Sequence, residues 1–187
     1  MQKPFWKKKF NKYSYILTDV IKACKKVGIN KIIVPLVDKG HIDKKNEFKN
    51  LIKICKEHQS YLKKNNQMIL FEVDFLPYKV LHFIKKLDHR FFGINYDIGN
   101  SASQNYNAFD EIRIYGKYIK NVHIKDRIKY GKTVRLGYGD ADFNCVFETL
   151  KKIKYKGKFI LQTARSPNKK HIDEIKINLE FLSKWFH

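Results

Sequence analysis

The alternation of short apolar runs with amphipathic stretches restricts the fold of this 187-residue chain more than any other feature. Five runs rich in Ile, Val, Leu or Phe have the length of buried strands, about four to eight residues. These runs are Lys31–Asp38, Gln67–Asp74, Phe91–Asp97, Tyr118–Lys125 and Gly157–Thr163. Such runs, separated by helical patterns, are typical of a sheet that is covered on its faces.

Apolar residues at helical spacing lie before, between and after these runs. They predict helices at 13–28, 46–64, 77–88, 106–117, 142–154 and 171–186. Gly28 can end the first helix, Pro77 suits the first turn of the third, and Asp142 can cap the fifth. The predicted apolar face of the last helix consists of Ile172, Ile175, Leu179 and Leu182.

One helix followed by five strand–helix units predicts a parallel sheet with right-handed crossovers. The strands begin about 32 residues apart on average, so eight units would need ~250 residues, the usual length of a (β/α)₈ barrel. We therefore predict an α/β fold, a partial TIM (β/α)₈ barrel. Residues 1–187 would form a single domain of about five parallel βα units preceded by one helix, without the first three βα units of a full barrel.

The net charge of +21 comes from 39 Lys and Arg against 18 Asp and Glu. Arginine, which is best suited to bidentate phosphate contacts, supplies five of the 39, and the lysines are spread along the chain. We interpret the charge as a solvated surface and expect no specific nucleic-acid partner. A true nucleic-acid surface and attraction of small anionic substrates remain open alternatives.

Several classes of protein are excluded by simple features. The apolar content of 43% and aromatic content of 14% exclude a disordered chain. No apolar run reaches the ~18 residues of a membrane span, and the basic segment 1–12 lacks the apolar core of a secretory signal. The three cysteines are far apart, which argues against a disulfide framework or a zinc knuckle. We expect a cytoplasmic protein with no membrane partner.

Polar side chains stand at the carboxyl ends of four consecutive predicted strands, where parallel α/β folds place their chemistry. They are Glu72, Asp97, His123 and Gln162. Carboxylate, imidazole and amide groups could together bind Mn²⁺, Mg²⁺ or Zn²⁺. The alternative for each residue alone is structural, because a strand-end aspartate often caps a helix and a single histidine is often a hydrogen-bonded core residue.

These residues belong to specific motifs. The motifs are Leu70-Phe-Glu72, Asn95-Tyr-Asp97-Ile-Gly-Asn100-Ser101, Asn121-Val-His123-Ile-Lys-Asp126-Arg127, Leu136-Gly-Tyr-Gly139-Asp-Ala-Asp142-Phe143 and Tyr155-Lys-Gly157-Lys-Phe-Ile-Leu-Gln162. Together they resemble the xylose-isomerase-like TIM-barrel superfamily, which holds sugar-phosphate isomerases and epimerases and also endonuclease IV. The Asp-x-Gly-Asn motif is most similar to the L-ribulose-5-phosphate/L-xylulose-5-phosphate 3-epimerases. The resemblance covers about residues 13–165, the second half of the family's barrel.

The resemblance implies one divalent metal ion held by Glu72, Asp97, His123 and the fourth position, where Gln162 replaces the family's glutamate. It also implies proton transfer next to a carbonyl through a metal-stabilised enediolate. A glutamine cannot move a proton, so Glu72 is expected as one base and Asp126 as the nearest second acid/base group. Alternatively, the reaction needs only one base, as in an aldose–ketose isomerisation or a dehydration.

A small phosphorylated sugar is the implied substrate, and the sequence offers polar residues around the same strand ends to bind it. The candidates are Asn100, Ser101, Lys125, Arg127 and Arg165. Turn formation by Asn100 and Ser101, and structural ion pairs of the arginines with Asp126 or Asp140, are the alternatives.

Two other functions remain open. A partial barrel could be a catalytically inactive or accessory protein that binds metal or sugar, as Gln162 suggests. An endonuclease IV-like DNA-repair enzyme would need several more His and Glu ligands for three zinc ions, and no comparable set is visible. The two open edges of a five-stranded sheet, including the apolar run Ile32–Val37, also predict self-association or a companion chain.

Overall fold

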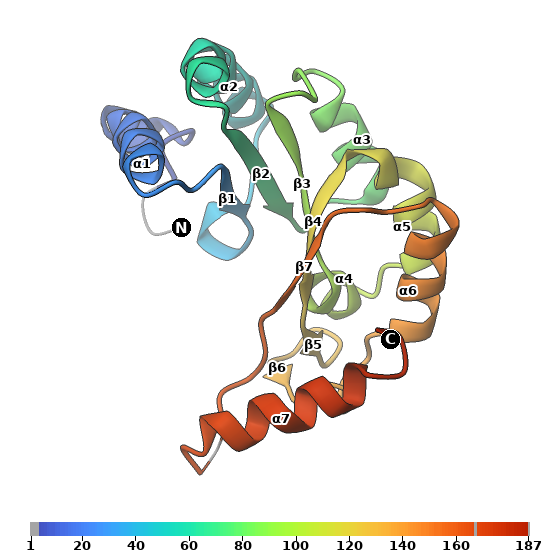
Figure 1. The fold of residues 1–187 in the computed structure, drawn as a ribbon. Coiled ribbons are helices and arrows are strands. Elements are labelled where there is room, and N and C mark those ends of the chain that lie inside the picture. The colour runs from blue at the N-terminus through green and yellow to red at the C-terminus, as the bar shows by residue number, and fades with distance from the viewer. Residues whose placement is uncertain (1–3, 167, 187) are drawn as a thin grey trace. The chain divides into compact units, whose positions relative to one another are not determined.

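The computed structural model describes residues 4–166 and 168–186, so the first three residues of the segment tested above for a secretory signal lie outside it. It contains a parallel five-stranded sheet whose strands alternate with helices (Figure 1). The strands, in their order across the sheet, are β1 (Lys31–Leu36), β2 (Met68–Val73), β3 (Phe92–Asp97), β4 (Ile119–Ile124) and β7 (Lys158–Leu161). Each lies inside one predicted apolar run, which confirms the predicted α/β class.

All six predicted helices are present, with ends that differ by a few residues. They are α1 (Tyr15–Lys26), α2 (Lys45–Asn65), α3 (Pro77–Ile84), α5 (Ala108–Tyr115), α6 (Phe143–Lys152) and α7 (His171–Leu182). Gly28, just beyond α1, has a φ of 74°, and Pro77 occupies the start of α3. The Asp142 carboxylate accepts a hydrogen bond from the Cys145 amide at 2.9 Å, which confirms the predicted cap of α6.

Some short elements were not predicted. They are the 3₁₀ turns η1 (Lys8–Tyr13), η2 (Asp38–Gly40) and η3 (Gly116–Tyr118), the helix α4 (Ile98–Ser103) and the antiparallel pair β5 (Asp126–Arg127) and β6 (Thr133–Val134). The last two elements matter most, because α4 directly follows β3 and the β5–β6 pair directly follows β4.

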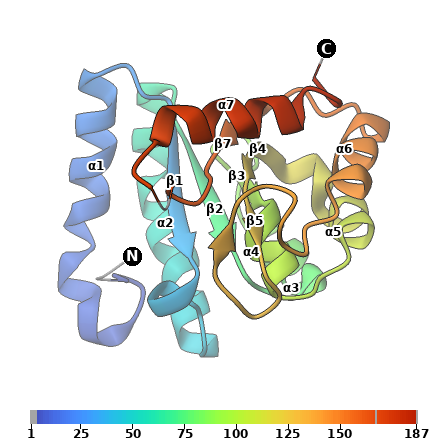
Figure 2. The ribbon, with the colours of Figure 1, turned by 90° about the horizontal axis from the view of Figure 1, so that it is seen from below.

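The chain divides into two compact units, residues 1–95 and 96–187, with the boundary inside β3. In the first unit β1 pairs with β2 along their full length, and β2 pairs with β3 so that Glu72 lies opposite Asn95. Aromatic rings fill the core: the Phe71 ring lies 5.0 Å from Phe83 and 6.2 Å from Phe92. Helices α1 and α2 lie side by side (Figure 2).

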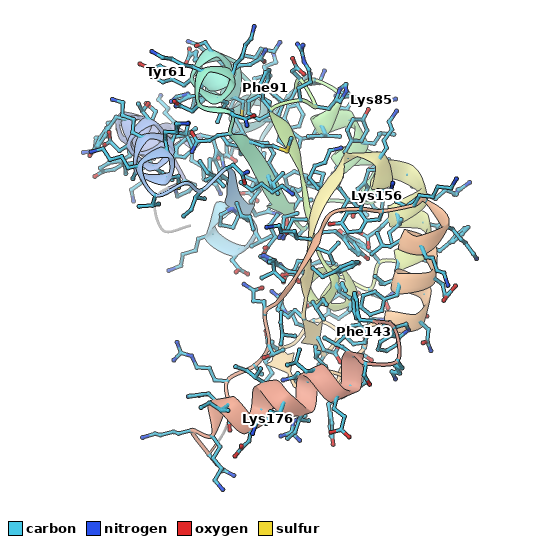
Figure 3. All side chains as sticks on the ribbon, viewed as in Figure 1. Tyr61, Lys85, Phe91, Phe143, Lys156 and Lys176 are labelled. Carbon is cyan, nitrogen blue, oxygen red and sulfur yellow. The ribbon has the colours of Figure 1, made fainter. Side chains whose placement is uncertain are left out.

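In the second unit β4 pairs with β7, and His123 lies opposite Ile160 in the register. An aromatic cluster packs α6 against the chain's last helix. It consists of Phe143, Phe147, Phe159, Phe181, Trp185 and Phe186, with ring centroids 4.9–6.1 Å apart. Lysines such as Lys85, Lys156 and Lys176 point away from the ribbon, as a solvated surface requires (Figure 3).

The predicted apolar face of α7 is wrong. Ile172, Ile175 and Leu179 are 71%, 47% and 56% exposed, and of the four predicted residues Leu182 alone is buried. The helix instead buries Glu174, Asn178 and Leu182. The buried Glu174 is held by a bidentate pair, since Arg135 donates from Nε and Nη2 to the two Glu174 oxygens at 2.7 Å each.

The sheet has two edge strands, β1 and β7, as predicted. Pro35 in β1 lacks the amide that an added strand would need, whereas β7 leaves Ile160 44% exposed. Among residues 4–166 and 168–186, no helix has the length and apolar character needed to cross a membrane.

Candidate active site

Glu72 lies near the carboxyl end of β2 in the first unit and is only 7% exposed. Because the register places it opposite Asn95, the two side chains meet across the strands. Asn95 donates from Nδ2 to Glu72 Oε2 at 3.0 Å. This bond fixes the direction in which the Glu72 carboxylate points.

Asp97 is the last residue of β3 and the N-cap of α4. Its Oδ1 accepts a hydrogen bond from the Asn100 amide at 2.8 Å, and the side chain is buried. Asn95 and Asp97 are two residues apart on one strand, so they face the same side of the sheet. Asp97 therefore caps a helix, as the structural alternative held, but it uses only Oδ1 for this bond. Its second oxygen, Oδ2, is left for another role.

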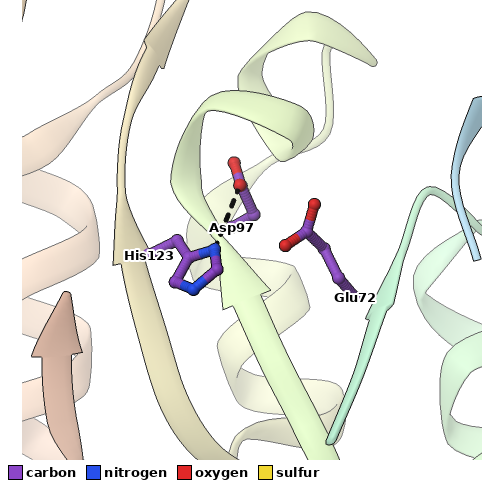
Figure 4. Close-up of side chains that lie close together, drawn as sticks. All are labelled: Glu72, Asp97 and His123. Atoms are coloured by element: carbon purple, nitrogen blue, oxygen red, sulfur yellow. Dashed lines mark ion pairs between the residues drawn. The ribbon is translucent and has the colours of Figure 1, made fainter. Parts of the chain in front are cut away.

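That second oxygen faces two cationic or basic groups of the second unit. His123 on β4 places Nδ1 3.7 Å from Asp97 Oδ2, an ion pair drawn in Figure 4. Lys125 places Nζ 2.7 Å from the same oxygen and also donates to Gln162 Oε1 at 3.3 Å. The ends of β3, β4 and β7 thus bring together Asp97, His123, Lys125 and Gln162. The ammonium of Lys125 compensates the charge of a carboxylate that would be costly to bury alone.

Glycine at position 99 makes this arrangement possible. A Cβ there would lie 2.9 Å from Lys125 Cγ, closer than side chains can pack, and 3.2 Å from Arg127 Cγ, which is a tight contact. The absence of a side chain lets the start of α4 approach the segment that follows β4.

Asp126 has a structural role that differs from the predicted acid/base role. It is fully buried, and its Oδ2 accepts hydrogen bonds from the Gly137 and Gly139 amides at 2.9 Å each. Its Oδ1 accepts from the Ala141 amide at 3.2 Å. These three bonds use both oxygens of the Asp126 carboxylate to hold the 137–141 loop.

Arg127 and Asn100 also hold the local structure. Arg127 donates to the Gly131 carbonyl from Nε at 3.1 Å and from Nη2 at 2.7 Å, and from Nη1 to Asn100 Oδ1 at 2.9 Å. These bonds close the turn of the β5–β6 pair and tie it to α4. The predicted ion pairs of Arg127 with Asp126 or Asp140 are wrong; Asp140 accepts instead from the Lys129 amide at 2.7 Å. The structure favours a structural role for Arg127 and Asn100 over a direct role in substrate binding.

Ser101 belongs to a buried hydroxyl–carboxylate cluster that sequence reasoning missed. Its hydroxyl donates to Glu111 Oε2, the Tyr96 hydroxyl donates to the same oxygen at 3.2 Å, and the Tyr115 hydroxyl donates to Oε1 at 2.6 Å. The same arrangement argues for a structural role of Ser101. Burial raises the pKa of the Glu111 carboxyl, even though its three hydrogen bonds act in the opposite direction.

We expect the Glu111 cluster to make stability depend on pH. Because the pKa of Glu111 is raised on folding, the folded state binds this proton more tightly than the unfolded state. The contribution is fully present below the ordinary pKa of 4.5 and is lost as the pH rises through the higher folded value. Urea unfolding between pH 4 and 8 should show this decline in the wild type and a smaller one in Glu111→Gln, because Asp74, whose pKa is also raised, still contributes. An identical pH dependence in both proteins would contradict the assignment.

Two further observations complete the placement of the predicted residues. Gln162 and Arg165 lie in the segment after β7, and both are exposed.

In the first unit, His41 Nδ1 lies 2.6 Å from Asp74 Oδ1. The pattern of strand ends did not predict this pair, because His41 follows β1 through a 3₁₀ turn. Burial raises the pKa of Asp74, and the bond from His41 acts against that shift.

Comparison with known proteins agrees with the order of elements. The model of the family described as xylose isomerase-like TIM barrel matches residues 11–185. The chain belongs to this family. A protein from Haemophilus influenzae, which bears the provisional name L-ribulose-5-phosphate 3-epimerase SgbU, is 31% identical over 86 residues. Those residues make up 42% of this chain and 30% of that relative.

Solved structures share the fold of this chain. D-allulose 3-epimerase from Methylomonas sp. has a TM-score of 0.83 at 16% identity, over 99% of this chain and 74% of its own. The IOLI protein with a bound zinc atom has a TM-score of 0.79 at 18% identity, over 97% of this chain and 74% of its own. The chain therefore spans less than a third of the curated relative and about three quarters of these two structures.

Proposed function

We propose that the chain carries a metal-dependent site of the sugar-phosphate isomerase and epimerase type, in which Glu72, Asp97 and His123 bind one divalent ion and Gln162 adds an amide oxygen. The observation that carries the proposal is the buried Asp97 carboxylate, which caps a helix with one oxygen and faces His123 with the other. Family membership supports it, as do the name of the Haemophilus influenzae relative and the zinc of the IOLI protein.

The residue types fit such an ion. Glu72, Asp97 and His123 are all buried, and each can offer one ligand atom. Two carboxylates and an imidazole suit Mn²⁺, Mg²⁺ or Zn²⁺. A divalent ion held there would polarise a substrate carbonyl. The Lys125 ammonium pairs with Asp97 Oδ2, so the ion would have to displace it from this oxygen in order to bind.

Glu72 is the proposed base. Its carboxylate, oriented by Asn95, would take the proton from the carbon next to the substrate carbonyl. Glu72 is the single proposed base for two reasons. The amide of Gln162 cannot take a proton, and the carboxylate of Asp126 already accepts three backbone hydrogen bonds. This favours a reaction in which one group moves a proton between neighbouring carbons, as in an aldose–ketose isomerisation. Lys125 and Arg165 are the proposed attractors of an anionic sugar phosphate.

A second candidate is an inactive or accessory protein that binds metal or sugar without turnover. Gln162 in place of a second acidic group favours it. An endonuclease-like function has less support, because further histidines of the first unit already have partners. His41 is bonded to Asp74, His58 Nε2 lies 2.9 Å from the Thr18 hydroxyl, and His82 stacks on Phe48.

Calorimetric titration of the metal-stripped protein with Mn²⁺ tests the ion site. We expect one site per chain, about 100-fold weaker binding in Asp97→Asn, and about 10-fold tighter binding in Lys125→Met, because the competing ammonium is gone. Lys129→Met, which removes an exposed lysine of the neighbouring turn, should bind like the wild type. Equal affinity in Asp97→Asn and the wild type would exclude Asp97 as a ligand.

Catalysis is tested separately by solvent deuterium exchange. Pentulose 5-phosphates are incubated with the Mn²⁺-loaded protein in D₂O, and incorporation at the carbons next to the carbonyl is followed by NMR. Exchange supports the isomerase proposal. Tight metal binding with no exchange for any of these sugars would favour the accessory function instead.

A further inference from the structure

A cavity of about 570 Å³ lies in the first unit, and Glu72, Asp97, His123 and Gln162 are not among the residues that line it. It is bordered by the start of α2, by α3 and by the loop that leads into α2; the two helices can be followed in Figure 1. Its apolar lining comes from Ile42, Phe48, Ile52 and Phe75. The volume falls in the range of about 300–1,000 Å³ that is usual for small-molecule sites.

The aromatic rings that line the cavity pack against buried residues of the core. The Phe48 ring packs edge-on against the Phe83 ring, with centroids 5.6 Å apart. The His82 ring stacks on the Phe48 ring, with centroids 6.0 Å apart and an angle of 24° between the ring planes. Phe75 also packs against Phe83, at 6.2 Å. Phe83 is fully buried, so these lining rings rest on the core of the unit and the cavity walls are held in place.

The rim of the cavity is strongly positive. The lining residues include Lys44, Lys45, Lys49, Lys79 and Lys86. The acidic side chain among them, Asp43, is already held by Lys7 at 2.9 Å, and that bond lowers the pKa of Asp43. Among the residues that the structure describes, the cavity therefore combines an apolar interior with a rim of cationic charge.

We propose that this cavity binds a small amphipathic anion, a molecule with an apolar body of about eight carbons and a phosphate or carboxylate head. The apolar lining would take the body, and the lysine rim would hold the head. A polar sugar phosphate does not match this lining, so the cavity is a second site that is independent of the proposed isomerase function. A second copy of the chain is a poor occupant, because each copy carries a net charge of +21 and the rims would repel.

Titration with octyl phosphate, followed by calorimetry and by NMR shifts of the lining residues, tests the proposal. Octyl phosphate and octanoate should bind, whereas octanol and inorganic phosphate, which each lack one half of the ligand, should bind at least about 10-fold more weakly. Added NaCl should weaken octyl phosphate and leave octanol unchanged, because screening acts on the charged head alone.

Charge reversal at the rim gives the deciding comparison. Lys45→Glu/Lys79→Glu should weaken octyl phosphate at least about 10-fold and leave octanol unchanged. The matched control, Lys63→Glu/Lys64→Glu, makes the same change in net charge at exposed positions near the other end of α2 and should bind octyl phosphate within about twofold of the wild type. Equal losses in both variants, or octanol binding as tight as octyl phosphate, would overturn the proposal.

Discussion

Replacing Glu72 with glutamine is expected to slow deuterium exchange into the substrate by about 10²–10⁴-fold, the usual contribution of a positioned proton-transfer group. The amide keeps an oxygen that can accept the hydrogen bond from Asn95, but it cannot accept a proton. Affinity for Mn²⁺ should fall by about 100-fold, as in Asp97→Asn, because the amide keeps a ligand oxygen but loses the negative charge, so exchange is measured at saturating Mn²⁺. The exchange rate and the calorimetric affinity, measured on the same preparation, separate the two roles of the residue.

The matched control is Glu57→Gln, which makes the same chemical change at an exposed position on α2. It should exchange deuterium at the wild-type rate. If Glu72→Gln did the same, another group would have to move the proton and the proposed base would be wrong.

Asp126→Ala is expected to reduce the free energy of unfolding by roughly 2–4 kcal/mol. The change leaves the amides of Gly137, Gly139 and Ala141 without their acceptor, and each partly buried amide that loses its partner costs about 1–3 kcal/mol. Relief from burying the carboxylate offsets part of this cost. Urea unfolding gives the free energy, and hydrogen exchange should show that these three amides lose protection together.

Asp140→Ala provides the comparison within the same loop. It removes one exposed bond, from the Lys129 amide, and should cost less than about 1 kcal/mol. Equal destabilisation by the two substitutions would show that the 137–141 loop does not depend on the buried Asp126 carboxylate.

The strands and most helices could be predicted because buried parallel strands leave continuous apolar runs, such as Met68–Val73, between helical patterns. The helix Ile98–Ser103 could not, since its Gly, Asn and Ser residues have no apolar periodicity. The exposed face of α7 was mistaken for the buried one. The spacing of Ile172, Ile175 and Leu179 is helical, but the sequence does not reveal that Glu174 is buried and paired with Arg135.

The candidate site was predictable in its residue types and their strand-end positions, and much less in their partners. Asp97 and His123 meet as expected. In the sequence, Asp126 and Arg127 were candidates for catalysis and substrate binding. In the structure, Asp126 accepts from backbone amides and Arg127 donates to a backbone carbonyl of the segment that follows them. Because almost every residue has a backbone amide and a carbonyl, the sequence does not show which of these groups will bond to a given side chain. Glu111 was overlooked for the related reason that a glutamate in a helix is ordinarily solvated.

The close approach at Gly99 limits how this part of the protein can evolve. A methyl group there would meet the stems of Lys125 and Arg127 at once, so no replacement at position 99 is neutral while both long side chains remain. The same Cβ would also lie 3.1 Å from the carbonyl carbon of Lys125, a backbone atom that remains whatever side chains stand at positions 125 and 127. The constraint therefore runs in one direction: Lys125 and Arg127 can change while Gly99 stays, whereas a replacement of Gly99 stays unfavourable even after both long side chains have been shortened.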